Sequence, residues 1–166
     1  KNVYSDYYDQ AFFDGYVTLR NAKYNIFSLN IHYLFVCEES LNINLTGVNF
    51  STNDFVQKTH LIPGKFNIGK WYRNLDCGFV LNDNHKELNI EKGKEYCYVN
   101  FQTDEKVNLK KFYLTDKIKK MISGEIIGMK NYKKEKSYSL EHSYEMFEKS
   151  QLRKYMLKEI RKNTLE

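Results

Sequence analysis

The sequence is poor in residues and runs that define several large protein classes. It has a single proline, Pro63, only eight glycines, and no apolar run near the eighteen or so residues that a membrane-spanning helix needs. We therefore expect no membrane partner. The hydrophobic fraction of 42% and the charged fraction of 28% are those of a folded globular chain, which argues against disorder over most of its length.

Cysteine is also scarce, and its spacing excludes two kinds of site. Cys37, Cys77 and Cys97 are separated by 40 and 20 positions, without the paired spacing of a zinc ribbon or the density of a secreted disulfide framework. Each lies in or beside an apolar run, where a free cysteine behaves as a small hydrophobic residue. The pattern favours a reducing, cytoplasmic setting and predicts no metal and no cofactor.

The chain has a net charge of +5, and most of the excess lies in one region. Residues 106–136 contain ten lysines and three acids, a surplus of seven positive charges. The rest of the chain is slightly acidic. A local patch of this kind attracts phosphate or an acidic partner, although a solvated lysine face is its commoner explanation. Nucleic acid is the less favoured partner. The candidate patch consists of Lys106, Lys110, Lys111, Lys117, Lys119 and Lys120.

Alternating polar and apolar residues in the stretch 61–113 predict the centre of the fold. Leu88 and Ile90 would share one face of a strand, Gly93 supplies the turn, and the run 96–101 is aromatic and β-branched. Together with a weaker alternation over 107–112, these runs predict a β-meander.

The flanking segments predict further elements. We expect strands at 16–19, 26–37, 41–45 and 56–62, with a turn at 21–23 and Leu41, Ile43 and Leu45 facing the core. Thr115 is expected to cap a helix over 116–123, and a single amphipathic helix is expected over 139–162.

These elements predict a mainly β, α+β fold, with an antiparallel β-sandwich or jelly-roll-like core and a C-terminal helical extension. The predicted division is a β-rich core domain at 1–114 and a helical extension at 115–166. The apolar stripe of the extension is expected to pack on the core, or on a neighbouring subunit of a homo-oligomer.

The central stretch carries a resemblance. The run Gly69-Lys70-Trp71-Tyr72-Arg73, followed by Leu88–Gly93 and Tyr98–Phe112, resembles a family of uncharacterised proteins of tailed phages and marine bacteria. The resemblance implies a β-rich fold and a viral or bacterial setting, the host cytoplasm if the gene is a phage's. The Ile90–Gly93 turn before an apolar strand is also similar to the last strands of trimeric dUTPase-like jelly rolls. The catalytic Gly-Ile-Asp-x-x-Tyr-like segment and the glycine-rich tail of those enzymes are missing, so the resemblance does not imply their chemistry.

Two groups of residues have the composition of a reactive site. His32, His60 and His85 would suit a divalent metal if the fold brought them together, but no local His-x-His spacing supports this, and separately placed histidines are the plainer interpretation. Cys77, His85 and Asp76 contain a thiol, a base and an orienting acid, a combination that also arises by chance. We assign no catalytic residue.

Trp71, Arg73 and Asp104 are the candidate ligand-binding residues. An aromatic plane and a forked cation on one side of a strand suit a base, a sugar or a phosphate, whereas the plain alternative has Trp71 anchoring the core edge. Two functions follow. The favoured one is a non-enzymatic binding or assembly module with a small-molecule or acidic partner, and the alternative is a small enzyme acting on a nucleotide or other phosphorylated metabolite near Trp71 and Arg73.

Overall fold

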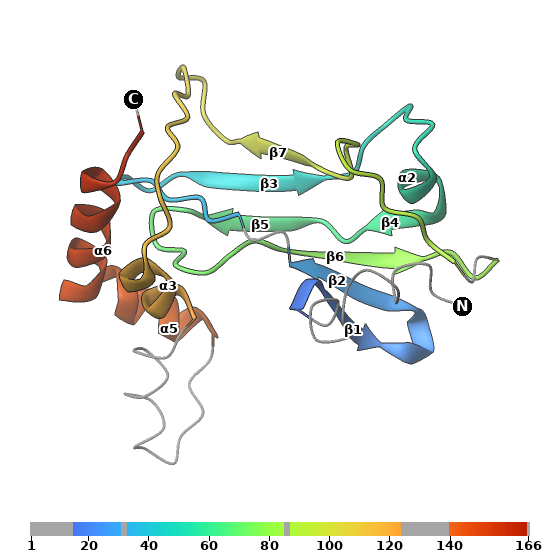
Figure 1. Ribbon diagram of the computed structural model, residues 1–166, viewed down its shortest axis with the longest axis horizontal. Coiled ribbons are helices and arrows are strands. Elements are labelled where there is room, and N and C mark those ends of the chain that lie inside the picture. The colour runs from blue at the N-terminus through green and yellow to red at the C-terminus, as the bar shows by residue number, and fades with distance from the viewer. Residues whose placement is uncertain (1–14, 31–32, 85–86, 124–139, 166) are drawn as a thin grey trace, which may run out of the picture. The chain divides into compact units, whose positions relative to one another are not determined.

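The computed structural model describes residues 15–30, 33–84, 87–123 and 140–165 and shows a mixed α+β chain with two antiparallel sheets (Figure 1). The first sheet has four strands in the order β1-β2-β6-β4. Their bounds are Val17–Asn21 for β1, Ile26–Asn30 for β2, Asp76–Leu81 for β6 and Thr59–Leu61 for β4. Each neighbouring pair in this sheet runs antiparallel.

The predicted turn at 21–23 is confirmed and has a clear local cause. The side chain of Asn21 accepts a hydrogen bond from the Lys23 amide at 3.0 Å, and a short 3-10 helix follows at Ala22–Tyr24. Asn25 then takes a left-handed conformation at φ 50°, which asparagine tolerates better than most residues. The chain thereby reverses from β1 into β2.

The second sheet has three strands in the order β5-β3-β7. Their bounds are Gly64–Asn67 for β5, Asn42–Thr46 for β3 and Tyr98–Phe101 for β7. In β3 the predicted alternation is confirmed at Ile43 and Leu45, which are buried while Asn44 between them is not. Leu41, also predicted to face the core, precedes the strand and is half-buried.

The predicted meander over 61–113 is wrong. Strand β6 pairs with β2 and β4, whereas β5 and β7 both flank β3 in the other sheet. The alternating run at 88–90 and the run at 107–112 are not strands, apart from an isolated bridge between Phe112 and Thr164. Alternation shows which side chains share a face, but a strand also needs a partner edge, and here the partners come from distant parts of the chain.

Two other predicted strands are shorter than expected. Of the described part of the run 26–37, Ile26–Asn30 is strand β2 and residues 33–37 are irregular, with 34–37 half-buried. Where a strand was predicted from residue 56, the chain forms α2, Asp54–Lys58, before β4 begins. Asn53 caps this helix by accepting from the Phe55 amide at 3.0 Å, which overrides the β preference of Val56.

The helices after residue 115 follow the sequence closely, with one difference. Helix α3, Asp116–Ile122, begins at the predicted cap, where Thr115 accepts from the Ile118 amide. The single predicted helix over 139–162 is two helices, α5 at Leu140–Glu148 and α6 at Gln151–Lys162. The break lies at Ser150, whose extended backbone and hydroxyl, accepting from the Arg153 amide, start a new helix.

The described chain forms two compact units, each assembled from several segments. Unit 1 holds the described parts of Lys1–Tyr33, Ile43–Lys65 and Leu75–Asn100, and unit 2 those of Leu34–Asn42, Phe66–Asn74 and Phe101–Glu166. This differs from the predicted division after residue 114, because segments 34–42, 66–74 and 101–114 belong with the helices. Unit 1 has an aromatic core in which Phe55 lies edge-on to Phe79 at 4.8 Å.

The core of unit 2 explains where the apolar stripe of the C-terminal helices goes. Tyr144 and Phe147 of α5 and Met156 of α6 are buried against Tyr72 and the α3 residues Ile118 and Met121. The stripe therefore packs within the core of unit 2, and its packing on a neighbouring subunit stays a prediction.

Candidate functional site

The structure places the predicted ligand-binding residues Trp71, Arg73 and Asp104 in unit 2, in different surroundings. Trp71 is half-buried, stacks on Tyr144 with ring centroids 4.5 Å apart, and meets the edge of the Phe66 ring at 4.5 Å. Arg73 and Asp104 are exposed. The indole ring thus anchors the core of unit 2. Ligand binding by the three residues stays a prediction.

The charge of Arg73 affects the pKa of a buried tyrosine, Tyr144, in the same core. Burial raises the pKa of the Tyr144 hydroxyl to about 12, and the positive charge of Arg73 opposes that rise. The Nε1 donor of Trp71 is buried and, among the described residues, has no hydrogen-bond partner. A ligand that accepts a hydrogen bond from this indole N–H therefore remains a hypothesis.

The six lysines of the predicted basic patch all lie on the surface of unit 2. Each is exposed, and Lys119 reaches Asp116 of its own helix at 3.3 Å. Exposure suits a solvated lysine face and a polyanion site equally, so the patch stays a prediction.

The metal and thiol combinations gain no support. His32 and His85 lie outside the described residues, and within ranges 15–30, 33–84, 87–123 and 140–165 no group of three His, Cys, Asp or Glu could hold a metal ion. Asp76 pairs with Arg20, and Cys77 is fully buried, which keeps a substrate away from its sulfur.

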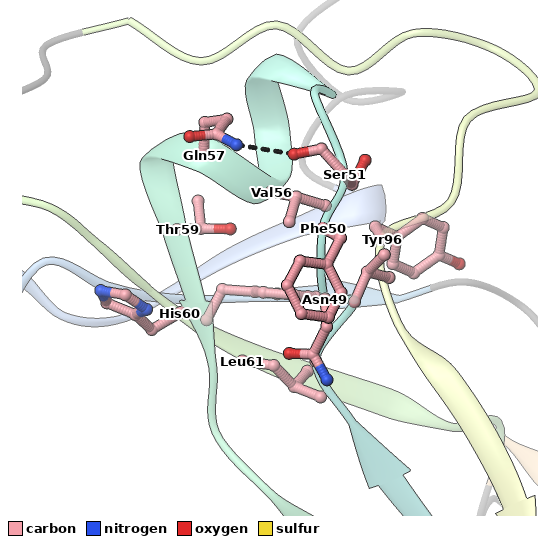
Figure 2. Close-up of a pocket in the computed structure, with 12 residues that line it drawn as sticks. Asn49, Phe50, Ser51, Val56, Gln57, Thr59, His60, Leu61 and Tyr96 are labelled. Atoms are coloured by element: carbon pink, nitrogen blue, oxygen red, sulfur yellow. Dashed lines mark hydrogen bonds between the residues drawn. The ribbon is translucent and has the colours of Figure 1, made fainter.

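Residues of unit 1 line a pocket (Figure 2). It has a volume of about 430 Å³, within the range of small-ligand sites. It lies among the loop 47–51, helix α2, strands β4 and β6, and Tyr96 just before β7. The lining residues are Gly47, Val48, Asn49, Phe50, Ser51, Val56, Gln57, Thr59, His60, Leu61, Phe79 and Tyr96.

The lining is aromatic and polar but carries no carboxylate, ammonium or guanidinium group among the described residues that form it. In the view of Figure 2, the His60 imidazole and the Tyr96 ring lie at opposite ends, with the Phe50 ring between them. Asn49 adds an amide and Ser51 a hydroxyl. This lining can pack against a ring and exchange hydrogen bonds with it, but it offers no formal charge to a phosphate or a carboxylate.

Hydrogen bonds hold the rim of the pocket in place. Gln57 Nε2 donates to the Ser51 carbonyl at 2.6 Å, and the Ser51 hydroxyl donates to Glu95 Oε1 at 2.8 Å. The Asn53 amide nitrogen donates to the Glu95 carbonyl at 2.5 Å. The bonds to Glu95, from its own backbone amide and from Ser51, lower the pKa of this carboxyl. The loop and the segment that carries Tyr96 are therefore linked before any ligand arrives.

Phe50 is the most unusual residue at the rim. Its side chain is fully exposed, at 106% of the reference area, and its backbone is left-handed at φ 59°. A residue with a Cβ pays roughly 1–2 kcal/mol for this conformation. An apolar ring held in water by a strained backbone is the kind of outlier that points to a binding role.

Of the residues that line this pocket, sequence reasoning singled out only His60, and as a possible metal ligand. The stretch 48–55 showed only the composition of a loop, and neither Phe50 nor Tyr96 stood out among the many aromatic residues. The Asn53-Asp54 pair was a usable signal for a helix start, but nothing local marked the left-handed backbone of Phe50.

Neither protein-family models, nor curated protein sequences, nor solved structures match this chain. Of the helices in the described part of the chain, none has the length and apolar character to cross a membrane.

Proposed function

We propose that this protein is a non-enzymatic binding module that takes a small uncharged ligand in the pocket of unit 1. The observation that carries the proposal is Phe50, a fully exposed aromatic residue held at φ 59° on the rim of that pocket. Selection for stability alone would favour glycine or asparagine at such a position. A ligand that stacks on the ring supplies the reason to keep phenylalanine.

The chemistry of the lining narrows the ligand class. Aromatic faces at Phe50 and Tyr96 suit the flat or apolar face of a ring, and the groups at Asn49 and His60 suit hydroxyl or amide substituents. The lack of charged groups in the described lining disfavours phosphorylated ligands, because a buried phosphate needs cationic or backbone donors. A neutral sugar, or a comparable ring with hydroxyl or acetamido groups, fits these features best.

The hydrogen-bonded rim supports binding by a preformed site. Ser51, Asn53 and Gln57 fix the loop to helix α2 and to Glu95, so little conformational entropy is lost when a ligand enters.

The test is a thermal-shift screen of neutral mono- and disaccharides, their N-acetylated forms and their phosphorylated counterparts, with calorimetry on any hit. We expect a neutral sugar to raise the Tm and the phosphorylated form of the same sugar to do so less. The variant Phe50→Gly should lose at least tenfold in affinity while its Tm stays equal or rises, because glycine relieves the left-handed backbone.

Two results would overturn the proposal. One is a Phe50→Gly variant that binds as the natural chain does. The other is a hit restricted to phosphorylated ligands that is lost in Arg73→Ala, which would favour the alternative of a small enzyme acting near Trp71 and Arg73.

The finer expectations from the sequence also stay proposals. They are a sandwich or jelly-roll packing of the sheets with the helices as an extension, assembly into a homo-oligomer, and a phage or bacterial cytoplasmic setting. The two antiparallel sheets support the first of these.

A further inference from the structure

Two of the three cysteines meet inside unit 1. Cys77 lies on β6 and is fully buried, and Cys97 lies one residue before β7 and is half-buried. Their sulfur atoms are 4.0 Å apart although the residues are 20 positions apart in the chain. Cys37, by contrast, belongs to unit 2.

The two thiols differ in access and in acidity. The hydrogen bond with the Cys97 sulfur and burial both raise the pKa of Cys77, so this thiol keeps its proton. The hydrogen bond between the two sulfur atoms lowers the pKa of Cys97. The half-buried residue is therefore also the better nucleophile, since the thiolate is the reactive form.

We propose that Cys77 and Cys97 form a reversible disulfide, with Cys97 as the attacking thiol and Cys77 as the resolving thiol toward a small-molecule disulfide. The inference is independent of the ligand proposed above. It assigns a redox modification site to two cysteines that the sequence analysis did not connect with each other.

The chemistry balances in two exchange steps. The Cys97 thiolate attacks one sulfur of an oxidant RSSR, forms a mixed disulfide and releases RS⁻. Cys77 then loses its proton to solvent and attacks the Cys97 sulfur, which forms the protein disulfide and releases the second RS⁻. In sum the two protein thiols lose two electrons and two protons, and RSSR is reduced to two RSH.

Disulfide formation requires the two sulfur atoms to move closer together. The sulfurs must approach from 4.0 Å to the bond length of about 2.05 Å. Cys77 lies on β6, an interior strand of the four-stranded sheet, opposite Leu29 of β2, whereas Cys97 is the last residue of an irregular segment, residues 87–97. Cys97 is thus the residue free to make the approach, by rotation of its side chain and a small shift of the segment.

The experiment uses the whole chain, reduced and then equilibrated without oxygen in buffers of oxidised and reduced glutathione. The samples are quenched with acid, alkylated and analysed by intact mass and peptide mapping. We expect a product that has lost two hydrogen atoms, a cross-linked peptide pair containing residues 77 and 97, an alkylated Cys37, and full reversal by dithiothreitol.

Matched variants separate the roles. Cys37→Ser should form the same disulfide at the same glutathione ratio. Cys77→Ala should accumulate a glutathione adduct on Cys97, and Cys97→Ala should give neither cross-link nor adduct on Cys77, because that thiol is buried. If Cys77→Ala proves unstable, the Cys97→Ala variant and the natural chain still decide the question.

Several outcomes would overturn the inference. These are a natural chain that carries glutathione on Cys97 without forming the cross-link, a disulfide that includes Cys37, or a cross-link that forms only in denaturant. Any of them would mean that the folded protein does not bring the two sulfurs within bonding reach.

Discussion

Arg153 on helix α6 is expected to hold two loop segments of unit 2 in place, and its removal is the sharpest test of that unit. Its Nε donates to the Gly69 carbonyl and one of its terminal nitrogens to the Glu38 carbonyl, each at 2.7 Å. One guanidinium thereby joins α6 to segments 34–42 and 66–74, which have little regular structure of their own. The planar fork of arginine suits two acceptors at once.

The cost of Arg153→Ala follows from those two bonds. A hydrogen bond from a charged donor contributes about 1.5–3 kcal/mol when well buried. Arg153 is half-buried, so water can replace part of each bond, and about 1 kcal/mol per bond is the fairer value. Alanine loses nothing in helix propensity. The expected loss is about 2 kcal/mol, or a fall in Tm of about 4–8 °C for a chain of this size.

The assay is urea unfolding together with amide hydrogen exchange. Exchange should rise at Cys37 and Ile68, whose amides donate across the two tethered segments to Ile68 and Leu41 carbonyls. The matched control is Arg161→Ala, which removes an exposed ion pair with the Glu38 carboxylate and should leave the midpoint nearly unchanged. The reasoning would be refuted if both variants lost the same free energy of unfolding, or if Arg153→Ala were as stable as the natural chain.

Three further predictions concern unit 2. Met156→Ala should lower the free energy of unfolding by about 3 kcal/mol, because the Met156 side chain is fully buried in the core. Met146 is 42% exposed, so Met146→Ala should change the free energy of unfolding by no more than about 0.5 kcal/mol. A similar loss in both variants would contradict the assigned core. Gly69→Ala should cost about 2 kcal/mol in urea unfolding, because its Cβ would lie 2.2 Å from a backbone oxygen of the facing segment, and a neutral result would show that this approach is looser. The hydrogen bond with Arg161 lowers the pKa of Glu38, so the small stabilisation from this pair is present above the ordinary carboxyl pKa of about 4.3 and is lost as the pH falls through the lowered value. Carboxyl NMR should show the pKa of Glu38 rising in Arg161→Ala, and an unchanged Glu38 titration would count against the pair.

The elements that the sequence predicted well are those set by interactions over a few residues. The Asn21 turn, the Thr115 cap and the alternation in β3 each depend on a side chain and backbone groups within one turn or one strand. The apolar positions of the C-terminal helices were also visible, because a helix that must bury one side repeats its apolar residues at helical spacing.

Two local capping signals were missed, one inside these helices and one ahead of α2. Ser150 lies inside the helix that the sequence predicted over 139–162, and its hydroxyl ends α5 by donating to the Phe147 carbonyl at 2.7 Å. Asn53 had the same role ahead of α2. In both cases a single capping side chain outweighed the apolar pattern around it.

The sequence by itself determined which residues seek burial and where the chain turns or starts a helix, because those preferences are properties of a side chain and its nearest backbone. Only the tertiary structure decided that β6 pairs with β2 and β4, that Trp71 stacks on Tyr144, that Phe50 stands at a pocket rim, and that Cys77 meets Cys97. Each of these depends on two surfaces far apart in the chain coming together. Alternation and spacing do not indicate which distant segment a strand or side chain will contact. Many pairings bury the same apolar area, and the packing of the whole chain selects among them.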